Sequence, residues 1–255
     1  MKTALAIAAH PDDIELMMAG TLLLLGDAGY DLHVLNIANG SCGSLTQDAE
    51  TLIARRNEEA QASAKVLGAT FHPPMVNDLE IFYEDGLLRR VAAVVRSVGP
   101  DIVLAQSPQD YMEDHMNACR LAVTAAFTRG MPNYATDPEM RPVEKPVTVY
   151  HALPWGLQGP LGEAIDANLH IDIASTLERK RAALECHQSQ KEWLDQTQGL
   201  DSYLDTMVDM ARKVGERTGA FEYAEGWRKH LHLGFCTENA DPLFDDLAAF
   251  ASRKD

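Results

Sequence analysis

The sequence of 255 residues lacks a long hydrophobic run. The apolar stretch near its start, Leu16 to Leu25, is too short to cross a bilayer and is typical of a buried helix face. The first three residues lead directly into an expected strand, which leaves no room for a signal peptide. We therefore expect a soluble, cytoplasmic protein that does not bind membranes.

Cysteine is scarce, and basic residues are fewer than acidic residues. The four cysteines, Cys42, Cys119, Cys186 and Cys236, are scattered without CxxC spacing, which favours reduced thiols over a thiolate zinc cluster. Lys and Arg total 22 against 38 Asp and Glu, so the formal net charge is −16. This balance argues against nucleic acid and anionic membrane surfaces as partners.

A dinucleotide fingerprint is also missing. The glycine-rich loop 39–43, Asn-Gly-Ser-Cys-Gly, lacks the GxGxxG spacing of nicotinamide enzymes. We therefore exclude that class of oxidoreductase and turn to what the sequence contains.

The chain is 46% hydrophobic, which suffices for one large α/β domain over residues 1–255. Strand and helix patterns alternate, as a mostly parallel sheet requires. We predict a Rossmann-like, doubly wound sheet with strand order 3-2-1-4-5 and helices on both faces. Residues 1–155 would form the core, and residues 156–255 would complete the fold or form an interface. Expected strands are 4–8, 32–38, 70–71, 101–105, 147–151, 170–173 and 228–233; expected helices are 13–27, 46–67, 86–98, 115–127, 177–196 and 202–217.

The most informative feature is the motif His10-Pro-Asp12-Asp13-Ile-Glu directly after the first expected strand. In the predicted strand order, the loop after strand one lies beside the loop after strand four, which carries His115. Two imidazoles and a carboxylate form a set that zinc accepts while keeping a position for water. We predict a site for one Zn²⁺ at His10, Asp13 and His115, although spacing alone does not decide which aspartate is a ligand and which a general base. Another divalent transition metal also fits such a set.

Each motif also has a purely structural interpretation. The His-Pro-Asp-Asp segment suits a turn with an N-capping aspartate, and the residues around His115 suit a helix start. Only the convergence of the two loops at the predicted switch point favours the metal site.

Several motifs follow one another in order along the chain. They are Ala-His-Pro-Asp-Asp-x-Glu, Arg56-Asn-Glu-Glu-Ala, a strand-four segment ending in Asp114-His115, Lys180 with His187-Gln-Ser-Gln, and, more loosely, Tyr223-Ala-Glu225. This ordered set resembles the PIG-L/LmbE-like family of zinc-dependent N-deacetylases. The resemblance implies removal of an acetyl group from an N-acetylglucosamine-type sugar or its conjugate, and a homo-oligomer. It matches His10, Asp13 and His115 to zinc ligands, and Asp12 to the general base.

The resemblance also matches Arg56 to a position that contacts substrate in relatives. The alternative is an exposed helix arginine paired with Glu58 or Glu59.

One position departs from the family pattern. Many relatives carry His-Pro-Asp-His where this chain has Met112-Glu-Asp114-His115, and methionine donates no hydrogen bond. We predict His151, at the end of strand five, as the substitute catalytic group in preference to Tyr111 and His187. Tyr111 would also lie near the substrate. Asp114 would orient an imidazole from behind.

The departure at Met112 leaves two alternative functions open. One is a zinc amidase acting on another small amide or a thiol conjugate. The other is a sugar-binding relative that has lost catalysis.

Overall fold

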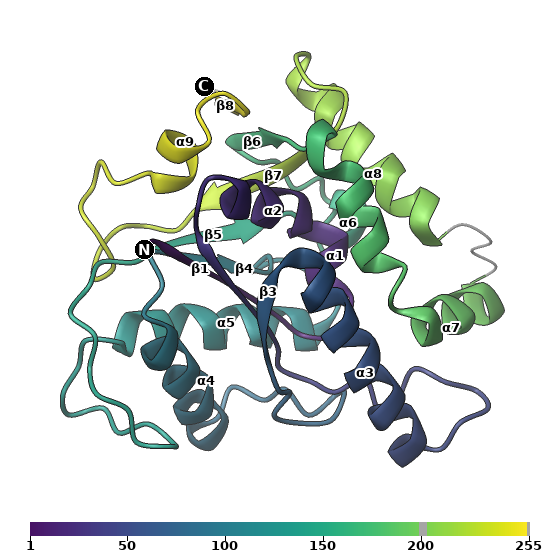
Figure 1. The fold of residues 1–255 in the computed structure, drawn as a ribbon, viewed down its shortest axis with the longest axis horizontal. Helices are drawn as coiled ribbons and strands as arrows, with labels where there is room; N and C mark the ends of the chain where they lie inside the picture. The colour runs from purple at the N-terminus through teal and green to yellow at the C-terminus, as the bar shows by residue number, and fades with distance from the viewer. Residues whose placement is uncertain (199–202, 254–255) are drawn as a thin grey trace.

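The computed structural model describes residues 1–198 and 203–253, which form one open sheet of eight strands flanked by helices (Figure 1). The strand order is β3-β2-β1-β4-β5-β7-β6-β8. The strands are β1 Thr3–Ala8, β2 Asp31–Asn36, β3 Ala69–His72, β4 Ile102–Ala105, β5 Thr148–Ala152, β6 Leu169–Asp172, β7 Ala224–Lys229 and β8 Ala251–Arg253. The helices are α1 Asp13–Met17, α2 Ala19–Asp27, α3 Ala49–Leu67, α4 Asp85–Val98, α5 Glu113–Thr128, α6 Leu177–Leu184, α7 Gln188–Gln198, α8 Tyr203–Thr218 and α9 Pro242–Asp246, with 3₁₀ turns at Trp155–Leu157 and Ala174–Thr176.

The first five strands are parallel and follow the predicted order 3-2-1-4-5. β1 lies at the centre and is buried on both faces, as its continuous apolar sequence indicates. Ala4, Ala6 and Ala8 face a core formed with α2, α3, α6 and α8. Leu5 and Ile7 face a second core formed with α4 and α5, which lie together on the other side of the sheet (Figure 1). The Rossmann-like α/β prediction is therefore confirmed.

The second part of the chain extends the same sheet with antiparallel strands. β7 pairs with β5 and with β6, and β6 pairs with β8. Apolar residues of α8, including Tyr203, Met207 and Ala211, are buried in the core. The described residues of this part pack against the same core and extend the same sheet, and assembly into a homo-oligomer stays a prediction. No helix in the described ranges is long and apolar enough to cross a membrane.

The helix predicted over residues 13–27 is instead two helices that break at Met18. Glu225, on β7, accepts hydrogen bonds from the backbone N–H groups of Gly20 and Thr21. This carboxylate satisfies N–H groups at the start of α2, so a new helix begins there. The contact joins positions more than two hundred residues apart, and no local pattern indicates it.

Two further element predictions need correction. The helix expected over residues 177–196 breaks between α6 and α7, where His187 is buried beside Glu15. The strand expected over residues 228–233 is β7, which runs from Ala224 to Lys229 and so begins and ends earlier than predicted. The side chain of His230, just after it, contacts His151 on β5. The helix expected from residue 202 is described from Tyr203, and residue 202 lies outside the described ranges.

Candidate active site

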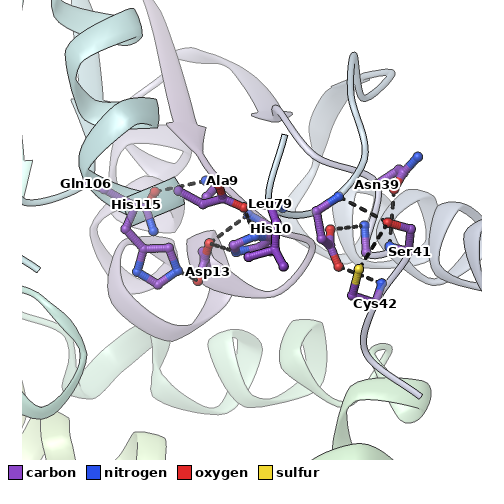
Figure 2. Close-up of polar contacts among 12 residues, drawn as sticks. Ala9, His10, Asp13, Asn39, Ser41, Cys42, Leu79, Gln106 and His115 are labelled. Carbon is purple, nitrogen blue, oxygen red and sulfur yellow. Dashed lines mark hydrogen bonds and ion pairs between the residues drawn. The ribbon is translucent and has the colours of Figure 1, made fainter. Parts of the chain in front are cut away.

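The loop after β1 places three predicted residues side by side. Asp12 has a φ of 109°, a left-handed conformation that is uncommon for a residue other than glycine. Such strain persists only where the surroundings enforce it, and it is concentrated at functional sites. The amide of Ala9 donates a 2.9 Å hydrogen bond to the side-chain oxygen of Gln106, which joins this loop to the loop after β4 (Figure 2).

His10, Asp13 and His115 form a compact set whose candidate ligand atoms all lie within 4.8 Å of one another. Nδ1 of His10 lies 3.5 Å from one oxygen of Asp13, and Nε2 of His115 lies 3.4 Å from the other. Zinc bonds of roughly 2.1 Å at tetrahedral angles separate neighbouring ligand atoms by about 3.4 Å. The spacing therefore fits the predicted metal.

A carboxylate lies behind each imidazole. Nε2 of His10 lies 2.9 Å from Asp114, as expected for a residue that orients a ligand, and the N–H of Leu79 donates to the same oxygen. Nδ1 of His115 lies 3.0 Å from Asp110. Such contacts fix which ring nitrogen faces a metal. Sequence reasoning missed the role of Asp110, although its place in the loop before α5 was a usable signal.

The carboxylates also control the protonation of the candidate ligands. Burial opposes protonation of His10, but Asp114 and Asp13 outweigh it and raise the pKa of this imidazole to about 10. Burial would raise the pKa of Asp13, yet His115 and His10 hold it well below its usual value. The pocket thus demands positive charge beside Asp13, which a divalent cation would supply.

Asp12 lies next to this set and is itself buried. Burial and the negative charge of Asp13 raise the pKa of Asp12 to about 6. The hydroxyl of Tyr203, on α8, donates a hydrogen bond to it, and Arg56 approaches to 3.9 Å. A carboxylate with a pKa near neutrality is suited to general base catalysis.

Arg56 is 2% exposed and donates a 2.7 Å hydrogen bond to the carbonyl of Pro11. The alternative of an exposed, glutamate-paired arginine is therefore wrong for this residue. Its neighbour Arg55 makes that pair, 3.0 Å from Glu59. A side chain at Gly40 would clash with Arg56, since an added Cβ would lie 2.4 Å from the Arg56 side chain.

One cavity of about 230 Å³ contains the candidate ligands and Asp12. Tyr111 lies on its rim and is 56% exposed, with its ring 5.7 Å from that of His115. The remaining walls combine aliphatic, aromatic and polar side chains, among them Met112, Trp155, Trp193, Asp78, Gln106, Gln190, Arg56 and Tyr203.

The structure places His151 outside this cavity. Side chains alternate along β5, so His151 points to the α5 face, where it lies 3.4 Å from Cys119. It contacts the carbonyl of Gln106 and Nδ1 of His230, and it lines a different cavity. Burial lowers its pKa to about 4. The prediction that His151 replaces the missing histidine is therefore wrong in geometry.

Tyr203 is a site residue that sequence reasoning missed. It follows the motifs by many residues and belongs to a helix whose pattern indicates only core packing. Gln190 also lines the cavity, and its place in the His-x-Ser-Gln motif was the available signal. Motif residues Lys180 and Glu225 form a buried ion pair of 2.6 Å, which is structural.

Comparison with known proteins identifies relatives. A protein-family model described as "PIG-L: GlcNAc-PI de-N-acetylase" matches residues 5–127. The diacetylchitobiose deacetylase of Thermococcus kodakarensis is 30% identical over 236 residues, which cover 89% of this chain and 83% of that protein. The 4-oxalmesaconate hydratase of Pseudomonas putida is also 30% identical, over 74% of each chain.

A solved structure shows the same fold. The crystal structure of the 4-carboxy-2-hydroxymuconate hydratase of Pseudomonas putida superposes with a TM-score of 0.76 at 25% identity and covers 94% of this chain and all of that one. The fold therefore carries both a deacetylase and hydratases among its relatives. Since the deacetylase relative matches over most of both chains, and the family description spans the motifs from β1 to α5, the chain belongs to the PIG-L family.

Proposed function

We propose that this chain is a metal-dependent hydrolase that removes the acetyl group from an N-acetylglucosamine-type sugar or its conjugate. The observation that carries the proposal is the buried carboxylate of Asp12 beside the set His10, Asp13 and His115 in one cavity. The relatives named as deacetylases of acetylated sugars support the substrate class.

The site residues have two tasks, metal binding and proton transfer. His10, Asp13 and His115 would hold one divalent metal, with zinc as the first candidate. A metal bound there supplies Lewis acidity toward the amide carbonyl and lowers the pKa of water toward 7. Asp12 accepts the proton of the attacking water and passes it to the departing amine nitrogen. Tyr203 holds the Asp12 carboxylate in place during both transfers.

The cavity walls suit a sugar. Trp155 and Trp193 present aromatic surface, on which the apolar faces of a pyranose ring can pack. Arg56 and Tyr111 offer donors to substrate oxygens from two sides of the site.

Hydration of a carboxylated substrate is the second candidate, because two relatives are named as hydratases. The charges of the cavity argue against it. Four aspartates line the cavity, while Arg56 is the one Lys or Arg among its lining residues within the described ranges. A substrate with several carboxylates would be repelled by this wall, whereas a neutral amide would not.

An acetate-release assay on metal-loaded protein tests the proposal. N-acetylglucosamine and its simple conjugates should yield acetate, and Asp12→Asn should abolish turnover while metal content stays at one equivalent. Asp245→Asn, an exposed aspartate on α9, is the matched control and should leave turnover unchanged. Hydration of a carboxylated substrate without acetate release from any sugar would favour the second candidate.

A further inference from the structure

Amide hydrolysis needs a hydrogen-bond donor where charge develops on the carbonyl oxygen. The family resemblance puts a histidine near this place, but the chain has Met112, whose thioether donates nothing. His151 lines another cavity and cannot serve. The proposed reaction therefore lacks an assigned donor on the protein.

Gln106 lies at the right place for that task. It follows β4 directly, is 5% exposed and lines the cavity that holds His10, Asp13 and His115. Figure 2 shows it beside His115, on the side of the site that faces Ala9. The backbone that Gln106 contacts leads straight into His10, so its position is tied to that of the candidate ligands.

The orientation of the Gln106 carboxamide follows from its contact. The N–H of Ala9 requires an oxygen as acceptor, so the 2.9 Å contact belongs to Oε1. The amide nitrogen must then point away from β1. Within residues 1–198 and 203–253 this nitrogen donates no hydrogen bond to another protein group. It is also not one of the fully enclosed polar atoms that lack a partner, so it remains accessible. Gln106 therefore offers a free and rigidly held donor.

The two hydroxyl donors nearest the site are already engaged. The hydroxyl of Ser107 donates to the carbonyl of Gln109, and the hydroxyl of Tyr203 donates to Asp12. Arg56 donates one N–H to the carbonyl of Pro11 and lies 3.9 Å from Asp12, and its remaining N–H groups are the ones proposed above to contact the substrate. Tyr111 is largely exposed on the rim, so its hydroxyl is not preorganised.

We propose that the side-chain N–H of Gln106 donates a hydrogen bond to the acetyl oxygen as it becomes an oxyanion, in place of the histidine missing at Met112. This inference rests on the proposed deacetylase function. As water oxygen bonds to the carbonyl carbon, the carbonyl π pair moves to oxygen, and Gln106 stabilises that charge. The oxygen pair then re-forms the carbonyl double bond as the C–N bond breaks. The electrons of the C–N bond leave with the amine nitrogen, which takes the proton held by Asp12.

Two substitutions separate donation from positioning. Gln106→Glu keeps an oxygen for the Ala9 amide but removes the donor, and Gln106→Met removes both without adding charge. Both should lower kcat about 10²–10³-fold while KM and the metal content of one equivalent change little. Gln109→Glu, in the same loop but outside the cavity, is the matched control and should retain kcat.

Binding supplies a readout that is independent of turnover. A phosphonamidate analogue of the acetamido group, whose tetrahedral centre mimics the oxyanion, should bind both Gln106 variants at least tenfold more weakly. Substrate affinity should change less. Met112→His should restore part of kcat in Gln106→Met and should add little to the otherwise unchanged protein.

The outcomes distinguish this inference from the function on which it rests. If the unsubstituted protein releases no acetate, the proposed function fails. If it releases acetate and both Gln106 variants stay within threefold of it, Gln106 is not the donor. Loss of kcat in Gln106→Met alone, or loss of metal in both variants, would show that Gln106 only positions the β1 loop and would overturn the proposal.

Discussion

The hydroxyl of Tyr203 donates a 2.5 Å hydrogen bond to Oδ2 of Asp12, although 191 positions separate the two residues. Both side chains are buried, at 1% and 3% exposure. The second part of the chain therefore supplies the group that holds the candidate base of the first part. The Rossmann-like half alone would leave this carboxylate without its hydroxyl partner.

Tyr203→Phe should lower kcat by about 10- to 100-fold. A hydrogen bond to a buried charged group contributes about 1.5–3 kcal/mol, and its loss would leave Asp12 poorly oriented. Steady-state kinetics on metal-loaded protein checks this expectation, with circular dichroism as a test of folding. Tyr83→Phe is a suitable control, since that hydroxyl contacts Thr124 on α5. A kcat within threefold of the parent value would argue against a role for Tyr203.

Asp110→Asn should weaken metal binding by roughly 10- to 100-fold. Asp110 holds Nδ1 of His115, and loss of such a partner reduces both the order and the basicity of the ligand. Competition with a chromophoric chelator measures the dissociation constant. Asp85→Asn, an exposed substitution on α4, should leave that constant unchanged. Equal affinities in all three proteins would mean that Asp110 does not support metal binding through His115.

The convergence of the β1 and β4 loops followed from the sequence, because parallel strands of known order place their carboxyl ends at one edge. His10, Asp13 and His115 could therefore be grouped from the sequence alone. Side-chain direction was harder to predict. His151 does stand at the predicted strand end, but the alternation along β5 turns it to the α5 face.

Long-range contacts account for the other differences. The break at Met18 depends on Glu225, and the hold on Asp12 depends on Tyr203. Neither relationship leaves a periodic signal, because each joins residues far apart in the chain. Motif position alone marked Glu225 as notable without revealing its structural task.

Lys180→Met should destabilise the fold by about 3–5 kcal/mol. The side chains of Lys180 and Glu225 are 2% and 4% exposed. The substitution would therefore leave the carboxylate of Glu225 buried without its counterion. Urea unfolding gives the change in free energy. The double variant Lys180→Met/Glu225→Gln should recover part of the loss. If Lys180→Met unfolds at the parent urea concentration, the pair contributes nothing to stability.

His151 should make the protein less stable as the pH falls from 6.5 toward 4. Burial lowers its folded pKa to about 4, against 6.5 for the unfolded chain. The unfolded chain therefore takes up this proton first, and the free energy of unfolding rises with pH across this window. Between pH 7 and pH 5 the loss is about 2 kcal/mol from this residue.

Urea unfolding of the parent protein and His151→Asn at both pH values checks this expectation. The variant should lose about 2 kcal/mol less than the parent on acidification. His232→Asn is a control on a histidine outside β7. An imidazole of His151 that titrates near pH 6.5 by NMR would contradict the assignment as a buried neutral residue.

Acetate release during zinc titration of chelator-stripped protein tests the central claim most directly. With N-acetylglucosamine and its simple conjugates as substrates, we expect activity to rise with zinc and reach a plateau at one equivalent per chain. Substitution of His115 by alanine should abolish both the tight binding of zinc and the release of acetate. Tight binding of one zinc without acetate from any N-acetylated sugar would contradict the account.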